Sequence, residues 1–184
     1  MRPARKSYHH GNLRQALIDK ALESLASKQD DLSLRALAVE AGVSPNAPYR
    51  HFKDKDALLA AIADFGFRQL SQQLKQVEAE GSNRRFREMA DRYVKFALAN
   101  QALYGVMMSH GAGDGLKTCQ DLVEEFVRVV TGEVTANDSV HKASTATWSL
   151  LHGYASLSTT VKGEGFDLTL TGEDLARMLS KGIR

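Results

Sequence analysis

The side chains best suited to chemistry in this chain are hydrogen-bond donors between positions 44 and 55. Asn46 has an amide that can pair with a base edge, and Tyr49 and His51 can donate to phosphate oxygens. Lys55 adds a positive charge at a helix start, where free backbone N–H groups also attract anions. These residue types indicate contact with a polyanion. DNA is the polyanion whose major groove admits a short exposed helix.

Two predicted helices would position these donors. Ser33 is a helix cap for residues 34–41, and Gly42 sits where a left-handed C-terminal cap is needed. Ser44 and the proline after it are typical of a helix start, which predicts a second helix over residues 45–52. The leading end of that helix, which would meet the groove, carries Ser44, Asn46, Ala47 and Pro48. The pattern is that of a helix-turn-helix.

Further contacts with DNA are expected around this motif. Ser33 can present its hydroxyl and the helix start to a phosphate, and Arg35 lies exposed beside it. Residues 1–10 form a basic arm that would track phosphates or enter the minor groove, with a solvated tail as the alternative. If the segment were a plain helical hairpin within a bundle, the donors named above would be ordinary surface residues.

Charge is distributed unevenly along the 184 residues, whose net charge is +2. Residues 1–55 contain ten Lys/Arg and six Asp/Glu, a balance of +4, whereas residues 56–184 contain fourteen and sixteen, a balance of −2. A basic N-terminal part favours a polyanionic partner for that part of the chain.

Two features indicate a cytoplasmic protein. Cys119 is the only cysteine, which excludes an internal disulfide and is typical of a reducing compartment. We expect it to be a buried or inert thiol rather than a redox sensor. The apolar runs are too short to span a membrane, and the basic N-terminus lacks the apolar stretch of a secretory signal.

Helical periodicity continues through the rest of the chain, without strand pairs or repeats. About nine helices are expected, near residues 13–25, 34–41, 45–52, 54–80, 84–100, 103–109, 116–131, 139–161 and after Thr171. Thr171 and Asp174 resemble a capping box for the last helix, and an extended piece is expected at 166–170. The fold class is all-α, with a three-helix DNA-binding head in residues 1–55 and a C-terminal helical bundle in residues 56–184.

The helix-turn-helix segment resembles the signature of TetR-family transcriptional regulators. The matching positions are Ser33, Leu34, Arg35, Leu37, Ala38, Ala41, Gly42, Val43, Ser44, Tyr49, His51, Phe52, Lys55 and Leu58. The chain departs from the family at Ala47 and Pro48, where Gly-Thr or Gly-Leu-like residues are common. Pro48 removes a helical N–H bond, which a tightened 3₁₀-like turn would accommodate. This departure bears on base readout more than on the fold.

The resemblance implies that the C-terminal bundle binds a small-molecule effector and forms a homodimer. Trp148-Ser-Leu-Leu-His152-Gly153 resembles the Trp-His-Gly motif of one TetR subgroup. Trp148 and His152 share a helix face and would line a pocket for an apolar ligand with a polar group, unless both are plain core residues. Further pocket candidates, with the same alternative, are Tyr93, Phe96, Tyr104, Met107 and Met108. The last two helices are the expected dimer seam.

The sequence thus predicts a ligand-responsive repressor, acting as a homodimer on a palindromic double-stranded DNA operator and without a cofactor or metal. Enzymatic interpretations are weak, because no nucleotide-binding, nucleophile-elbow or metal-binding motif occurs. The alternative is an architectural or partner-recruiting DNA-binding protein without an effector pocket. A helical enzyme is a third hypothesis.

Overall fold

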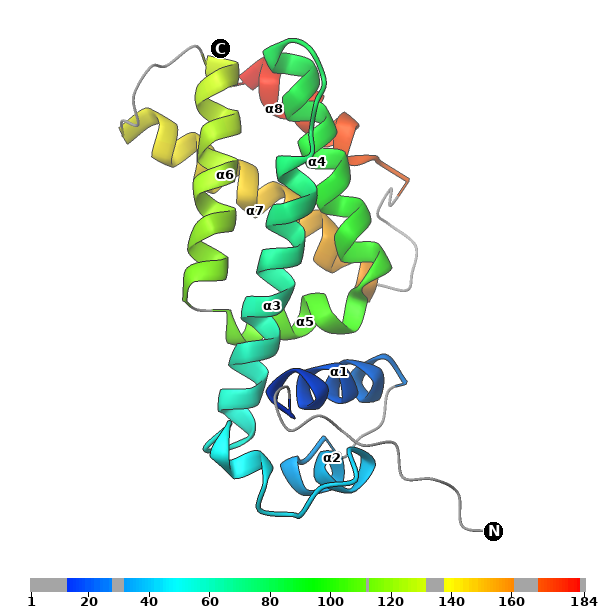
Figure 1. Cartoon of the computed structure of the whole chain (residues 1–184). Helices are drawn as coiled ribbons and strands as arrows, with labels where there is room; N and C mark the ends of the chain where they lie inside the picture. The colour runs from blue at the N-terminus through cyan, green and yellow to red at the C-terminus, as the bar shows by residue number, and fades with distance from the viewer. Residues whose placement is uncertain (1–12, 28–31, 112, 132–137, 161–168, 183–184) are drawn as a thin grey trace. The chain divides into compact units, whose positions relative to one another are not determined.

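The computed structural model describes residues 13–27, 32–111, 113–131, 138–160 and 169–182 (Figure 1). All regular structure in these residues is helical, which confirms the all-α prediction. The elements are α1 (Leu13–Ala26), α2 (Leu34–Glu40), the 3₁₀ helix η1 (Pro48–Arg50), α3 (Lys55–Lys75), α4 (Ser82–Ala99), α5 (Gln101–His110), α6 (Asp114–Thr131), α7 (Asp138–Thr160) and α8 (Gly172–Gly182). The basic arm and the first residues of the expected extended piece lie outside the described residues.

Residue contacts divide the chain into two compact units, Met1–Ile62 and Ala63–Arg184. The division falls within α3, which is one continuous helix. The sequence-based boundary between residues 55 and 56 stays a prediction about where the functional domains separate.

The turn after α2 in the N-terminal unit is built by local hydrogen bonds. Ser33 Oγ accepts from the Ala36 N–H at 3.2 Å and caps the start of the helix, as predicted. At the other end Gly42 has φ 68°, and the N–H groups of Gly42 and Val43 donate to the carbonyls of Val39 and Ala38. This pair of bonds is a Schellman motif, which needs the left-handed residue that glycine supplies.

The predicted α-helix over residues 45–52 is wrong in type. Only Pro48–Arg50 is helical, as a 3₁₀ turn, and Ser44 is not its cap. The Ala47 N–H donates to the Ser44 carbonyl at 2.9 Å, closing a three-residue spacing. Pro48 has no N–H and therefore cannot donate to Ser44, so the first α-helical bond cannot form. The tightened turn that the proline was expected to require is confirmed.

Helix α3 begins as predicted and ends earlier than predicted. Asp54 Oδ1 accepts from the Ala57 N–H at 2.8 Å, which is an N-terminal cap. The helix stops at Lys75 rather than near Glu80, because the chain turns there and the Val77 N–H donates to the Leu74 carbonyl. That turn places the Val77 side chain in the core.

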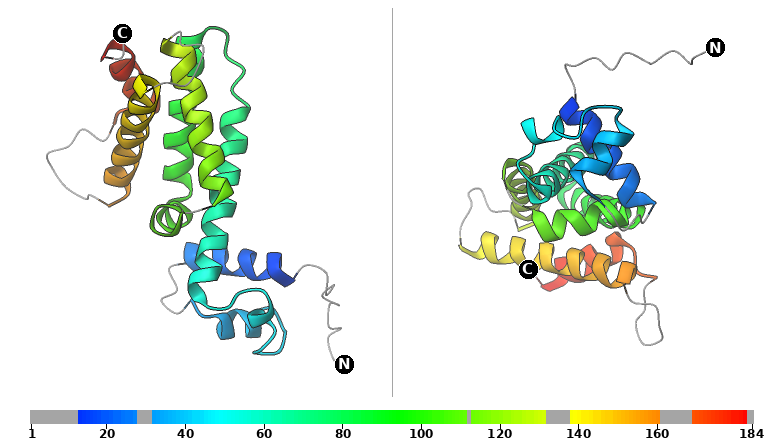
Figure 2. Two further views of the ribbon diagram at one scale, coloured as in Figure 1. Left: turned by 90° about the vertical axis from the view of Figure 1, so that its left-hand side faces the viewer. Right: turned by 90° about the horizontal axis from the view of Figure 1, so that it is seen from below.

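In the C-terminal unit, α4 packs against α6, α7 and α8, and α7 and α8 lie side by side (Figure 2). The backbone of α8 approaches α4 so closely at Gly172 that an added Cβ would overlap the backbone of Ala90 and Asp91. The predicted capping box is confirmed, because Thr171 Oγ1 accepts from the Asp174 N–H and Asp174 Oδ2 accepts from the Thr171 N–H. No helix among the described residues is long and apolar enough to cross a membrane.

We expect Gly172→Ala to destabilise the C-terminal unit by about 1–3 kcal/mol, because the neighbouring backbone cannot move aside as a side chain can. Urea unfolding followed by circular dichroism measures the change. Gly105→Ala in α5 is the matched control, since its added Cβ meets no atom within 4 Å and should stabilise the helix slightly. Equal stability of the two variants would contradict the close approach.

Candidate functional site

Exposed polar side chains follow the turn after α2 in the N-terminal unit. Among the predicted DNA contacts, Ser44, Asn46, Tyr49, His51 and Lys55 are exposed, as is Arg35 on α2. Ser33 and Ala47 are partly exposed. Pro48 is buried, so it would influence this surface through the backbone turn rather than by contact.

Arg50 belongs to the same surface, although the sequence analysis omitted it. It lies between Tyr49 and His51 in the 3₁₀ turn, and its side chain is exposed. Its positive charge four residues after Asn46 was the available signal. Within the described part of the chain, the side chains of Arg35, Arg50 and Lys55 form no ion pair or hydrogen bond.

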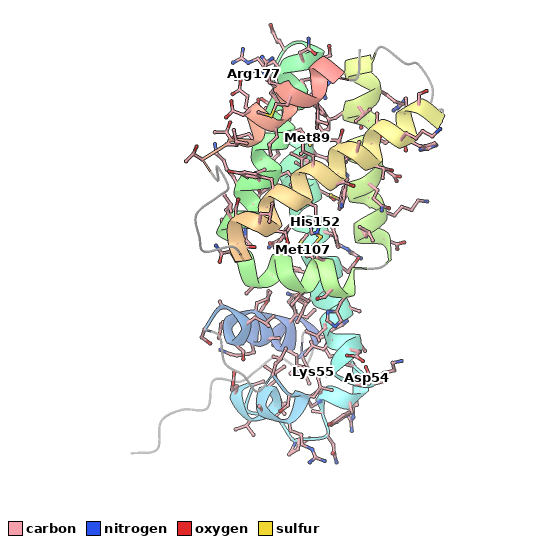
Figure 3. All side chains as sticks on the ribbon, turned by 180° about the vertical axis from the view of Figure 1, so that it is seen from behind. Asp54, Lys55, Met89, Met107, His152 and Arg177 are labelled. Carbon is pink, nitrogen blue, oxygen red and sulfur yellow. The ribbon has the colours of Figure 1, made fainter. Side chains whose placement is uncertain are left out.

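Lys55 lies at the start of α3, next to Asp54 (Figure 3). One oxygen of the Asp54 carboxylate caps α3 and the other lies 3.7 Å from Lys53 Nζ, so its charge is shared between the helix start and Lys53. Lys55 therefore keeps a free ammonium beside a helix N-terminus, which is a favourable place for a phosphate. The surface can hold an anion through several unpaired cations and neutral donors.

The second candidate site is a buried aromatic cluster in the C-terminal unit. The Tyr93 and Tyr104 hydroxyl oxygens are 3.0 Å apart, and the Tyr104 hydroxyl lies 2.8 Å from His152 Nδ1. The Trp148 ring packs edge-on against Tyr93 and stacks on Phe67, with centroids 5.7 and 6.3 Å apart. The cluster therefore joins α3, α4, α5 and α7.

Four of the seven predicted ligand-binding residues meet in this cluster, namely Tyr93, Tyr104, Trp148 and His152. Phe96 and Met107 are buried and Met108 is partly exposed. Among the described residues, no hydrogen bond or ring contact links these three to the cluster. Met107 instead lies against α3, where its Sδ is 2.6 Å from the place a Cβ on Gly66 would take.

The hydrogen bonds from Tyr93 through Tyr104 to His152 form a relay whose direction follows from which acceptors are available. Burial raises the pKa of Tyr93 well above its usual value and that of Tyr104 to about 12, so both phenols keep their protons. If His152 Nδ1 accepts from Tyr104, then Tyr93 can donate to Tyr104, and both hydroxyl protons are in hydrogen bonds. The reverse direction would leave the Tyr93 proton without an oxygen or nitrogen acceptor among the described residues, which costs about 1–3 kcal/mol. The relay therefore favours the His152 tautomer with its proton on Nε2.

Sequence reasoning missed Phe67 and Ser71 on α3, which no motif marks. Cys119 on α6 is fully buried, as expected. Burial raises the pKa of its thiol to about 12, and the neighbouring Ser71 hydroxyl opposes that rise. The Ser71 hydroxyl is itself buried and completes no hydrogen bond of good geometry. The thiol is thus protonated and inert at neutral pH.

Two family models match the chain. The model described as "Bacterial regulatory proteins, tetR family" matches residues 17–62, and the model described as "Tetracyclin repressor-like, C-terminal domain" matches residues 86–181. A curated relative, an uncharacterized HTH-type transcriptional regulator of Haemophilus influenzae, is 43% identical over 75 residues. The match spans 38% of this chain and only 37% of the relative's length.

Solved structures resemble nearly the whole chain. A protein of unknown function from Rhodococcus sp. RHA1 is 31% identical, with 97% of this chain and 98% of that chain covered and a TM-score of 0.76. BioQ, solved with its double-stranded DNA operator, is 18% identical, with 92% and 96% covered and a TM-score of 0.65. At that identity the likeness to BioQ shows the fold alone.

We expect Tyr104→Phe to destabilise the C-terminal unit by about 1–3 kcal/mol, because it leaves the Tyr93 hydroxyl and His152 Nδ1 without their shared partner. Tyr154→Phe is the matched control. Tyr154 is also buried, but its hydroxyl has no hydrogen bond among the described residues. Urea unfolding compares the two variants, and an equal effect would show that the relay contributes no stability.

Proposed function

The chain belongs to the TetR family of bacterial regulatory proteins, and we propose that it is a cytoplasmic repressor that binds a DNA operator and releases it on binding a small molecule. The observation that carries the DNA-binding part is the set of unpaired cations, Arg35, Arg50 and Lys55, beside the exposed donors of the helix-turn-helix. Neutralising phosphates with free cations supplies most of the affinity of such a surface.

Within this proposal the surface divides by role. Phosphates are held by Tyr49, Arg50, His51 and Lys55. At the start of α2, Ser33 and Arg35 hold the DNA backbone. Ser44, Asn46 and Ala47 lie on the turn before η1 and would approach the bases. Pro48 contributes by fixing the backbone of that turn.

The aromatic cluster is the proposed effector site. Trp148, His152 and Gly153 would then represent the Trp-His-Gly motif of the TetR subgroup that the sequence resembles. The contacts of Trp148 and His152 with Tyr93 and Tyr104 support a site in which α7 shares its ligand with α4 and α5. Phe96, Met107 and Met108 belong to the surrounding wall in this proposal.

Effector and operator would oppose each other through α3. This helix carries Lys55 at its start and Phe67, which stacks on Trp148, further along. In this proposal α3 has two positions. A ligand that binds best when α3 is in one position lowers the population of molecules with α3 in the other position. By linkage, DNA that prefers the other position lowers the affinity for the ligand by the same factor.

We further propose a homodimer whose seam is formed by α7 and α8, so that two heads read the halves of a palindromic operator. Small side chains on the outer face of α7 support this choice. Ala146 and Ser149 are exposed, and a Cβ added to Gly153 would meet no atom within 4 Å. Such a surface lets a second helix approach closely.

Lys55→Ala tests the DNA-binding proposal. Footprinting on DNA flanking the protein's own gene locates a bound fragment. On that fragment the variant should bind more weakly and lose about one unit of the slope of log K against log salt concentration, because one phosphate contact is gone. Lys75→Ala, at the exposed end of the same helix, should change neither quantity. An unchanged slope in Lys55→Ala would contradict the phosphate contact.

Ala146→Arg tests the seam. A charge placed between two copies of α7 should weaken the dimer about tenfold or more, as measured by analytical ultracentrifugation. Ala99→Arg, at the exposed end of α4, is the control that adds the same charge elsewhere. If the two variants dimerise equally, the seam lies on another surface.

A further inference from the structure

The two residues that α7 contributes to the aromatic cluster each have a ring nitrogen that could bind a ligand. Trp148 and His152 are one helical turn apart and both are partly exposed. Within the described part of the chain, the Trp148 indole N–H and His152 Nε2 have no hydrogen-bond partner. The other end of the relay, Tyr93 and Tyr104, is buried. An entering molecule would therefore meet the α7 end of the relay.

The direction of the relay decides whether His152 Nε2 is a donor or an acceptor. In the favoured direction Tyr104 donates to Nδ1, and the neutral His152 ring then carries its proton on Nε2. The Trp148 indole N–H is a donor in every state. A group that satisfies both must therefore be an acceptor, and a carbonyl oxygen has the two lone pairs that this requires.

The cluster lacks the side chains that usually pair with an ionic ligand. Its side chains are Phe67, Tyr93, Tyr104, Trp148 and His152, none of them a lysine, arginine or carboxylate. Both phenols hold their protons and the neighbouring Cys119 thiol is protonated, so no phenolate or thiolate is present to attract a cation or to attack an electrophile. The flat ring of Trp148, which is partly exposed, favours a planar apolar body.

We propose that the effector is an uncharged, planar molecule bearing a carbonyl-type acceptor, held without a covalent bond by the His152 Nε2–H and the Trp148 indole N–H. This inference deepens the proposed function and rests on its effector site. It excludes organic acids, cations and thiol-reactive compounds as the preferred class.

The experiment compares three probes of one ring size: acetylnaphthalene, a neutral ketone; naphthalene, which has no acceptor; and naphthoate, an anion. Trp148 is the only tryptophan, so the full chain labelled with nitrogen-15 gives a single indole N–H signal. Titrating each probe against that signal measures binding at the site itself. The ketone should bind about tenfold more tightly than the other two, the gain expected when its oxygen accepts hydrogen bonds from donors that the bound ring shields from water.

Substitutions of His152 test whether its side chain binds the carbonyl oxygen of the ketone. His152→Leu should remove the preference for the ketone, and His152→Gln, which keeps an N–H donor, should restore part of it. His141→Leu makes the same change at an exposed position of α7 and should leave the preference intact. If His152→Leu fails to fold, the three probes on the unaltered chain still decide.

The proposal is overturned if naphthalene matches the ketone, if naphthoate binds best, if no probe moves the indole signal, or if His152→Leu keeps the preference. Binding of the unaltered chain to its footprinted DNA, measured without any probe, decides the DNA-binding function separately. A chain that binds DNA and ignores all three probes keeps that function and loses this effector class.

Discussion

The C-terminal unit depends on the need to satisfy two phenols inside a helical bundle. Tyr93 and Tyr104 lie on different helices, and their aromatic rings supply apolar surface to the core. Their hydroxyls must find partners there, because a buried polar group without one is costly. They pair with each other and with His152, which ties α4, α5 and α7 to one register. The position of Trp148 is then also set, since Trp148 lies one turn from His152 on α7.

In the N-terminal unit the main constraint is a backbone N–H that proline lacks. Pro48 has no N–H and is buried, so the α-helical bond to the Ser44 carbonyl cannot form and the chain closes a 3₁₀ turn at this point. In that turn Tyr49, Arg50 and His51 are successive residues, all exposed. The proline anchors the turn in the core of this unit while its neighbours remain in solvent. The residues that would touch DNA are therefore set by a backbone restriction rather than by helical periodicity.

The sequence was sufficient to predict those features that depend on residues close together in the chain. The caps at Ser33, Asp54 and Thr171 each use a side chain within three residues of its backbone partner, so the sequence predicts them directly. The end of α3 was not predicted, because the local sequence does not show that Val77 is buried just beyond it. The hydrogen bond from Tyr104 to His152 joins positions 48 residues apart, which periodicity on either helix cannot reveal. The spacing of Trp148 and His152 indicated a shared face but not its partners.

The two candidate sites differ in kind. The helix-turn-helix surface is exposed and carries unpaired cations, whose attraction for a polyanion is long-ranged and weakened by salt. The aromatic cluster is mostly buried and contains no lysine, arginine or carboxylate, so as the proposed effector site it would recognise shape and one acceptor at contact distance. Helix α3 is the element that belongs to both units. The proposed neutral ligand cannot act on DNA through charge, and the stacking of Trp148 on Phe67 is a packing contact that links its site to α3.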